Sequence, residues 1–347
     1  MTLTKIQGKI EEEQGIYYEV DADSEPLGEG GMGKVYAGVR VDEKTGARRD
    51  VAIKFLYDDL DDKALMHARR EASIQLHNDN LIEMFGFSEV EDKNVLGETI
   101  KHYHIASELL DGISLADFLE GNLQSVTGET SPMTKDLYAQ FLKDRSAFSV
   151  RVIRNVLSGL MALHDAGYIH RDIDPTNIML TKDGRIKIID FGIAKKVSNL
   201  GSRDRSLTVS GIFIGKPEYA APELVLGDIK HQDATTDIYA VGILLYQCLV
   251  GSVPFKGPRH EVLEMQQKKD LPLRNIKDSR LRAIVAKATN KKQSKRYHSV
   301  AEFRAALDFL SPRPDTISSF PDLKIWIITI ASGLILGGIL GYFTALE

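Results

Sequence analysis

The sequence predicts an α+β protein with a β-rich N-terminal part, a mainly helical C-terminal part and one C-terminal transmembrane helix. Three patterns support this prediction. Alternating and β-branched runs between residues 27 and 109 indicate strands, with one helical run at 61–76. Apolar residues recur at helical spacing from residue 148 onward. The run 325–346 carries no charge and has the length that a bilayer-spanning helix needs.

The composition is that of an ordinary globular protein and argues against nucleic-acid binding. Of the 347 residues, 43% are hydrophobic and 27% are charged, and the formal net charge is −5, so no basic footprint exists. Cys248 is the only cysteine, which excludes an internal disulfide and fits a reducing compartment. The N-terminal residues are polar and acidic, unlike a secretory signal.

The run 325–346 is interpreted as a single membrane span. A buried C-terminal helix is the alternative, but such a helix normally has a polar face and this run has none. Trp326 and Tyr342 stand near its two ends, where aromatic residues anchor membrane helices. Lys324 precedes the span, so the positive-inside rule places the bulk of the chain in the cytoplasm. The expected location is the cell membrane, with membrane lipid as a partner.

Three glycines, Gly333, Gly337 and Gly341, share one face of this predicted span. Small residues at four-residue spacing let two helices approach closely, which favours a homodimer. Glycine is also frequent in membrane helices in general, so this spacing leaves the alternative of a monomer open.

A glycine-rich turn lies near the start of the β-rich part. Gly28, Gly30 and Gly33 form GxGxxG, and Val35 extends the pattern. A dinucleotide-binding turn would require a helix after the last glycine. Here the alternating run KVYAGVRV follows, which predicts a strand. A strand–turn–strand flap whose backbone closely approaches phosphate oxygens is therefore expected.

The stretch 168–192 gathers the polar residues with the strongest chemical pattern. Two short apolar strands, 178–181 and 186–189, are joined by a Lys-Asp-Gly turn. Asp172 and Asn177 precede or begin this hairpin, and Asp190 follows it. A hairpin brings these three side chains to one edge, where two can hold a divalent metal and one can accept a proton.

These motifs together resemble the eukaryotic-type (Hanks-type) protein kinases, most closely the bacterial membrane-anchored serine/threonine kinases. HRDxxxxN and DFG lie in 168–192, VAIK contains Lys54, Ala221-Pro222-Glu223 supplies APE, and 237–242 supplies DxYxxG. The resemblance covers about 27–310 and implies a two-lobed fold. The expected parts are a leader at 1–24, an N-lobe at 25–110, a C-lobe at 111–310, a linker at 311–324 and the span at 325–346.

The resemblance implies a role for each matching residue. Asp172 would accept or orient the substrate hydroxyl proton, and Asn177 and Asp190 would hold Mg²⁺, with Mn²⁺ as an alternative. Lys54 would hold the ATP phosphates and pair with Glu71, and Glu223 would pair with Arg296. The expected nucleotide-binding residues are Leu27, Gly28, Glu29, Gly30, Gly31, Met32, Gly33, Val35, Ala52, Lys54, Glu71, Ser107, Glu108, Leu110 and Met179.

Two positions depart from the family pattern. Asp174 stands where serine/threonine kinases usually have lysine, and Lys216 stands where they usually have threonine. In the family these positions lie beside the catalytic aspartate, so one hypothesis is a compensating exchange in which Lys216 supplies the missing ammonium and pairs with Asp174. The alternative is a weak kinase or pseudokinase that acts as an ATP-binding scaffold.

The expected function is membrane-tethered phosphorylation of serine or threonine in protein substrates, because the post-HRD pattern of tyrosine kinases is absent. Arg171 before Asp172 implies control by activation-loop autophosphorylation. The alternative is that the serines and threonines of this loop are ordinary polar loop residues that are not phosphorylated. Dimerisation through the kinase domain and the membrane helix would favour phosphorylation between copies. The candidate phosphorylation sites are Thr208 and Ser210, then Ser206, Ser202 and Ser198.

Overall fold

The computed structural model describes residues 3–93, 97–125, 128–191, 194–196 and 215–310. In these ranges no helix has both the length and the apolar character to cross a membrane. The predicted linker and span at 311–346 lie outside the described residues, and so do the candidate phosphorylation sites Thr208, Ser210, Ser206, Ser202 and Ser198.

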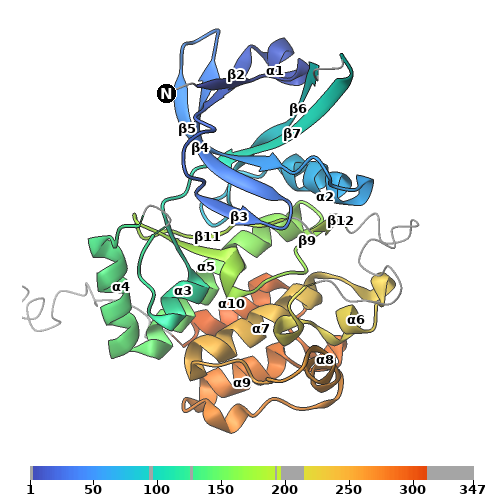
Figure 1. The fold of residues 1–347 in the computed structure, drawn as a ribbon. Coiled ribbons are helices and arrows are strands. Elements are labelled where there is room, and N and C mark those ends of the chain that lie inside the picture. The colour runs from blue at the N-terminus through green and yellow to red at the C-terminus, as the bar shows by residue number, and fades with distance from the viewer. Residues whose placement is uncertain (1–2, 94–96, 126–127, 192–193, 197–214, 311–347) are drawn as a thin grey trace, which may run out of the picture. The chain divides into compact units, whose positions relative to one another are not determined.

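The expected two lobes are present, one β-rich and one mainly helical (Figure 1). A seven-stranded sheet forms the first lobe in the order β1-β2-β4-β5-β7-β6, with β3 paired to β4. Its elements are β1 Thr4–Ile6, α1 Lys9–Gln14, β2 Ile16–Val20, β3 Gly28–Gly30, β4 Gly33–Asp42, β5 Arg48–Leu56, α2 Asp62–Ser73, β6 Met84–Lys93 and β7 Thr99–Glu108.

The glycine-rich flap is the hairpin of β3 and β4. Gly28 pairs with Val35 and Gly30 with Gly33, and β4 continues antiparallel to β5, where Val35 is opposite Lys54. Gly33 has a φ of 157°, and a Cβ there would lie 1.9 Å from the Phe55 carbonyl oxygen. Only glycine allows this close approach, so the strand–turn–strand prediction is consistent with the local sterics.

The N-terminal residues are part of the sheet rather than a separate leader. The strand expected near Tyr17–Val20 is β2, but β1 and α1 were not foreseen. Tyr18 and Val20 are buried in the same apolar cluster as Ile53 of β5. Buried Glu11 of α1 accepts a hydrogen bond from Ser88 Oγ of β6 at 2.7 Å. The segment therefore contacts both the β2 side and the β6 edge of the sheet.

The second lobe is built around α7 Ala234–Val250, whose residues are almost all buried. Its polar Asp237 and its Tyr239 are fully enclosed together with apolar neighbours. The other elements are β8 Gly112–Ser114, α3 Leu115–Glu120, α4 Pro132–Lys143, α5 Arg145–Asp165, β9 Tyr168–Ile169, β10 Ile178–Thr181, β11 Ile186–Ile188, β12 Lys195–Lys196, α6 Pro222–Val225, α8 Arg259–Lys268, α9 Ser279–Ala288 and α10 Val300–Asp308.

The polar region 120–144 is more ordered than the sequence suggested. Its composition is that of a surface insertion, but its second half forms α4, whose Leu137 and Phe141 are buried. The Phe141 ring contacts those of Phe118 and Phe148 at centroid distances of 5.5 and 5.2 Å. This helix is amphipathic, with apolar residues four apart on one face, and the many polar residues around it obscured that pattern.

Candidate active site

The β10–β11 hairpin places the three predicted catalytic polar residues together. Ile178 of β10 pairs with Ile188 of β11, so Asn177 and Asp190 flank the open end of the hairpin. Asn177 Nδ2 donates to the Asp172 carbonyl oxygen at 2.9 Å and to Asp172 Oδ2 at 3.3 Å. The Ile189 N–H donates to the Asn177 carbonyl oxygen at 3.0 Å. Local hairpin geometry thus gathers Asp172, Asn177 and Asp190 at one edge.

The turn that carries Asp172 is fixed by the interior of the helical lobe. Asp237 of α7 accepts hydrogen bonds from the backbone N–H groups of His170 and Arg171 at 2.8 and 2.7 Å. It also interacts with His164 Nε2 at 2.7 Å. Arg171 has a φ of 70°, a left-handed conformation that is rare outside glycine. The buried Asp237 carboxylate stabilises this strained turn and so fixes the direction of the next residue, Asp172.

The carboxyl group of Asp172 is less acidic than usual. Burial raises its pKa to about 7, with further increases from the neighbouring Asp174 and Asp190. The ammonium of Lys216 and the hydrogen bond from Asn177 act in the opposite direction. A carboxyl group with a pKa near the working pH is suited to accept a proton and release it again.

Lys216 and Asp174, the two unusual residues, are in direct contact. Lys216 Nζ lies 2.7 Å from Asp174 Oδ1 and 2.5 Å from Thr176 Oγ1. Asp174 Oδ1 also accepts from the Thr176 backbone N–H and hydroxyl, each at 2.7 Å. The contact expected from the sequence is therefore present, and it holds an ammonium group beside Asp172.

A cavity of about 330 Å³ opens between the flap, α2 and the β10–β11 hairpin, a size typical of small-ligand sites. Of the predicted nucleotide-binding residues, those that line it are Leu27, Gly28, Val35, Ala52, Lys54, Glu71, Ser107, Glu108, Leu110 and Met179, together with Asn177 and Asp190. Glu29, Gly30, Gly31, Met32 and Gly33 lie in the flap outside this lining. The apolar lining residues that the sequence analysis missed are Ile82, Met84, Ile105, Leu109 and Ile189.

Glu71 and Lys54 line the same cavity, but the ion pair implied by the resemblance is not formed between these two described residues. Glu71 Oε2 is buried and has no hydrogen-bond partner. Burial raises the Glu71 pKa to about 7, and the nearby Asp190 adds to this, whereas Lys54 lowers it. The Glu71 carboxyl group thus lies close to Asp190 and has no direct counterion among the described residues.

The side-chain chemistry of this cavity fits a bound cation and the phosphates that it accompanies. Asp190 and Asn177 present oxygen atoms of the types that Mg²⁺ and Mn²⁺ prefer. Three buried or part-buried acids, Glu71, Asp172 and Asp190, influence one another there, and Glu71 retains an orphaned oxygen. A divalent cation would relieve this excess of negative charge.

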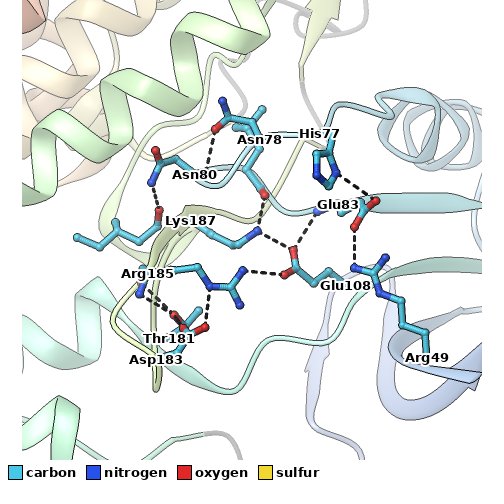
Figure 2. A network of polar contacts seen from close by, with 12 residues as sticks. Arg49, His77, Asn78, Asn80, Glu83, Glu108, Thr181, Asp183, Arg185 and Lys187 are labelled. Carbon is cyan, nitrogen blue, oxygen red and sulfur yellow. Dashed lines mark hydrogen bonds and ion pairs between the residues drawn. The ribbon is translucent and has the colours of Figure 1, made fainter.

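Glu108 lines the cavity, as the resemblance implied, and its side chain also has a structural part. Its backbone N–H donates to the Glu83 carbonyl oxygen at 2.8 Å. Its side chain accepts from Lys187 Nζ at 2.8 Å and from Arg185 at 3.5 Å (Figure 2). Lys187 Nζ also donates to the Leu81 carbonyl oxygen at 2.9 Å.

Figure 2 shows that this network continues across the connection between the lobes. Glu83 pairs with Arg49 at 2.7 Å and with His77 at 3.5 Å. Asn80 Nδ2 donates to the Ile186 carbonyl oxygen at 2.9 Å. The strand that leads to Asp190 is therefore tied to the β-rich lobe through polar contacts that the sequence analysis did not identify.

The buried pair expected between Glu223 and Arg296 is present. Arg296 Nη1 lies 2.7 Å from Glu223 Oε1, and Nη2 lies 2.9 Å from Oε2, so the contact is bidentate. Arg296 also donates to the carbonyl oxygens of Asn290 and Thr235. This pair links the end of the segment after Asp190 to the last part of the helical lobe.

The fold and this constellation define a protein kinase domain, and the chain belongs to that family. Residues 22–307 match the family described as "Protein kinase domain". This match covers both lobes and all the site residues discussed above. The N-terminal elements β1, α1 and β2 lie outside the matched range.

Similar full-length proteins are bacterial kinases. The serine/threonine-protein kinase PknB of Mycolicibacterium smegmatis is 31% identical over 292 residues, which is 82% of this chain and 41% of that protein. The probable serine/threonine-protein kinase PknB of Corynebacterium glutamicum is 32% identical over 307 residues, or 85% and 42%. Serine/threonine-protein kinase pkn2 of Myxococcus xanthus is 32% identical over 298 residues, or 81% and 31%. The chain spans less than half the length of these relatives.

Proposed function

We propose that this chain is an ATP-dependent serine/threonine protein kinase. The observation that supports this function best is the convergence of Asp172, Asn177 and Asp190 beside a cavity lined by Lys54. The names of the bacterial relatives support serine and threonine as the acceptor residues. Proteins are therefore the proposed substrates and ATP the proposed phosphate donor.

Each step of the mechanism has a residue in place. The cavity walls Ala52, Val35 and Met179 enclose the base, and Lys54 holds the phosphates. Mg²⁺, or Mn²⁺ in its place, would be held by Asn177 and Asp190 and would neutralise phosphate charge. Asp172 accepts a hydrogen bond from the substrate hydroxyl, orients it and takes its proton. Positioning and charge stabilisation then supply most of the rate enhancement.

Lys216 supplies the positive charge beside Asp172 in this proposal. Its contact with Asp174 orients the ammonium group, and its field favours the ionised form of Asp172. The ammonium can also stabilise negative charge that develops on the transferred group. Lys216 thus supplies, from position 216, the ammonium group that the family pattern usually places at position 174.

A second candidate function is a weakly active or inactive ATP-binding scaffold. The absent Lys54–Glu71 ion pair favours this alternative, because both residues lie at the cavity without meeting. Ligand binding that brings Lys54 to Glu71 would support the enzyme instead. Measurable phosphotransfer separates the two functions.

We further propose that the kinase domain faces the cytoplasm on a single membrane span at 325–346. The charge-free sequence and the flanking Trp326 and Tyr342 support this location. Dimerisation through Gly333, Gly337 and Gly341 would bring two kinase domains together. Autophosphorylation in 198–210 would then regulate activity.

Incubation of the full chain with labelled ATP and magnesium tests the proposed activity. The expected result is phosphate incorporation that disappears in Asp172→Asn, followed by mapping of the modified serines and threonines. ATP binding without incorporation in the unchanged chain would reject the enzyme in favour of the scaffold.

A further inference from the structure

A chain of buried hydrogen bonds connects the interior of the helical lobe to the segment that carries Lys216. Gln266 of α8 is fully buried. Its Nε2 donates to the carbonyl oxygen of Pro217 at 3.3 Å and, in a shorter contact, to that of Glu218. Both carbonyl groups belong to the 3₁₀ turn Pro217–Tyr219, which directly follows Lys216.

The chain continues from Gln266 through Tyr239. Tyr239, on α7, is fully buried and its hydroxyl donates to Gln266 Oε1 at 2.6 Å. Lys291 Nζ donates to the Tyr239 hydroxyl oxygen at 2.7 Å. The Tyr239 ring also stacks on the Arg296 guanidinium, whose carbon lies 4.9 Å from the ring centroid. Lys291 belongs to the lysine-rich run 291–296, which has the composition of a solvated loop, but its side chain is half-buried.

The direction of these hydrogen bonds is set at both ends of the chain of contacts. A protonated lysine can only donate, so the Tyr239 oxygen accepts and its proton turns toward Gln266. The carbonyl groups of Pro217 and Glu218 can only accept, so Gln266 presents its NH₂ group to them and its oxygen to Tyr239. Lys291 and the turn therefore favour the same amide orientation.

Other contacts hold the same segment from its two ends. Arg259 of α8 donates to the Gly215 carbonyl oxygen at 3.3 Å. The Tyr219 hydroxyl donates to Gln247 Oε1 of α7 at 2.5 Å. Between these ends, Gln266 is the side chain that fixes the backbone next to Lys216. The position of the Lys216 ammonium, and thus its contact with Asp174, depends on that backbone.

We infer that Gln266, oriented by Tyr239 and Lys291, is a positioning residue that shapes 215–219 for protein substrates. This inference rests on the proposed kinase function. The turn lies beside Asp174 and Asp172 through Lys216, so a polypeptide that presents its hydroxyl to Asp172 passes along it. A free turn would let Lys216 and the substrate backbone shift together.

Stability alone does not account for this arrangement. Buried polar chains are often no more stabilising than apolar residues of equal shape, and any broken link leaves unsatisfied groups. The turn itself needs no glutamine from another helix, because its backbone bonds such as Tyr219 N–H to the Lys216 carbonyl oxygen are local. A positioning role predicts effects on protein substrate that packing alone does not.

The helix α7 provides a matched control in Tyr246. Tyr246 is as buried as Tyr239, but its hydroxyl contacts the Pro272 carbonyl oxygen at 3.4 Å and Asn275 Nδ2 at 3.0 Å, away from 215–219. Tyr239→Phe and Tyr246→Phe therefore each remove one buried hydroxyl from the same helix. Only the first interrupts the path to Gln266.

The experiment compares these variants in the full chain by steady-state kinetics and hydrogen–deuterium exchange. Tyr239→Phe should raise the KM for protein substrate about three- to tenfold, leave the KM for ATP unchanged and speed exchange in 215–219. Gln266→Met should act in the same direction, by at least about tenfold, since the Glu218 carbonyl loses its Gln266 donor and the Pro217 carbonyl keeps only the Ala220 N–H. Tyr246→Phe should change neither quantity.

Equal protein-substrate KM values and equal exchange in Tyr239→Phe and Tyr246→Phe would overturn the inference. Parallel increases in both KM values would also overturn it, because they would indicate a general loss of structure. If the unchanged chain transfers no phosphate, the proposed function itself fails. That result differs from an active enzyme in which the two phenylalanine variants behave alike.

Discussion

Lys216 and Asp174 stand 42 positions apart in the chain, yet Lys216 Nζ lies 2.7 Å from Asp174 Oδ1. The Asp174 side chain is only 2% exposed, whereas that of Lys216 is 42% exposed. Asp174 is therefore held in the protein interior, and the partly exposed Lys216 side chain extends inward to contact it. The two departures from the family pattern are one interaction beside Asp172, the proposed catalytic residue.

Removal of the Lys216 charge should strongly lower turnover. In Lys216→Met, Asp174 keeps its bonds to Thr176 but loses its cation, and Asp172 loses a nearby positive charge. We expect kcat to fall by about 10²-fold, the typical effect of one preorganised electrostatic group. Lys216→Thr should be equally poor, and Lys216→Thr with Asp174→Lys should recover much of the activity. Lys182→Met, at an exposed pair with Asp111, is the control. Full activity in Lys216→Met would contradict the compensating exchange.

The elevated pKa of Asp172 gives a directional pH prediction. In the ligand-free protein the carboxyl group should titrate near pH 7, so its proton-accepting form is lost as the pH falls below that value. Asp174→Asn removes a negative neighbour and should lower this pKa. Lys216→Met removes a positive neighbour and should raise it. Carbon-13 NMR of aspartate-labelled protein measures both shifts.

Activity profiles provide a second test of the same prediction. The acid limb of kcat/KM should move to lower pH in Asp174→Asn, in step with the carboxyl titration. A limb that stays in place while the NMR titration moves would show that another group controls the acid side. No shift of either measurement would contradict the electrostatic coupling between Asp172 and Asp174.

Glu71→Gln should stabilise the ligand-free protein while it impairs phosphotransfer. The folded pKa of about 7 lies above the ordinary value of 4.5, so ionisation of Glu71 opposes folding. This penalty is absent below pH 4.5, grows up to about pH 7 and is constant above, where it reaches roughly 3 kcal/mol. Glutamine has no such penalty.

Chemical denaturation at pH 4.5 and at pH 8 measures this difference. The two proteins should be similar at the lower pH and differ most at the higher pH. Glu12→Gln, at an exposed position of α1, should show no pH-dependent difference from the unchanged chain. Equal stabilities of Glu71→Gln and the unchanged chain at pH 8 would mean that Glu71 has a counterion in solution.

The parts of the site that the sequence predicted are those with local causes. A Lys-Asp-Gly turn between two apolar runs dictates the β10–β11 hairpin, and the hairpin places Asn177 and Asp190 without help from distant residues. The Lys216–Asp174 contact was also predictable, because the two departures carry opposite charges at positions that lie together in the family. The resemblance supplied this proximity, which chain spacing alone does not give.

The missed features depend on side chains that meet only after folding. Glu108 was expected as a nucleotide-binding residue, and the contact of its carboxylate with Lys187 of β11 was not foreseen. Lys291 belongs to a basic run that is typical of a solvated loop, but its ammonium group donates a hydrogen bond to the buried Tyr239 of the helical lobe. The polar surroundings of Phe141 concealed the apolar face of α4. The periodicity of apolar residues predicts which face of a helix or strand is buried, but it does not predict which polar side chains form hydrogen bonds with one another.

Lys187→Met should weaken the connection between the two lobes. The Lys187 side chain is 4% exposed, and its loss leaves the 12% exposed Glu108 carboxylate with the exposed Arg185 at 3.5 Å as its remaining cation and with a hydrogen bond from the Glu83 N–H. Loss of one partner from a buried pair typically costs about 3 kcal/mol. Because Glu108 adjoins the nucleotide cavity, the KM for ATP should rise as well.

A double-mutant cycle separates this pair from a general packing effect. Glu108→Gln relieves the stranded charge, so Lys187→Met with Glu108→Gln should be more stable than the sum of the single changes predicts. Lys182→Met, in the β10–β11 turn three residues before Glu108's partner Arg185 and at the surface, should be nearly neutral. Strict additivity of the two buried substitutions would contradict the interaction. If the cycle gives a coupling energy but the KM for ATP does not change, the contact between Lys187 and Glu108 contributes to stability alone. If the KM for ATP changes together with the stability, the strand before Asp190 also contributes to nucleotide binding.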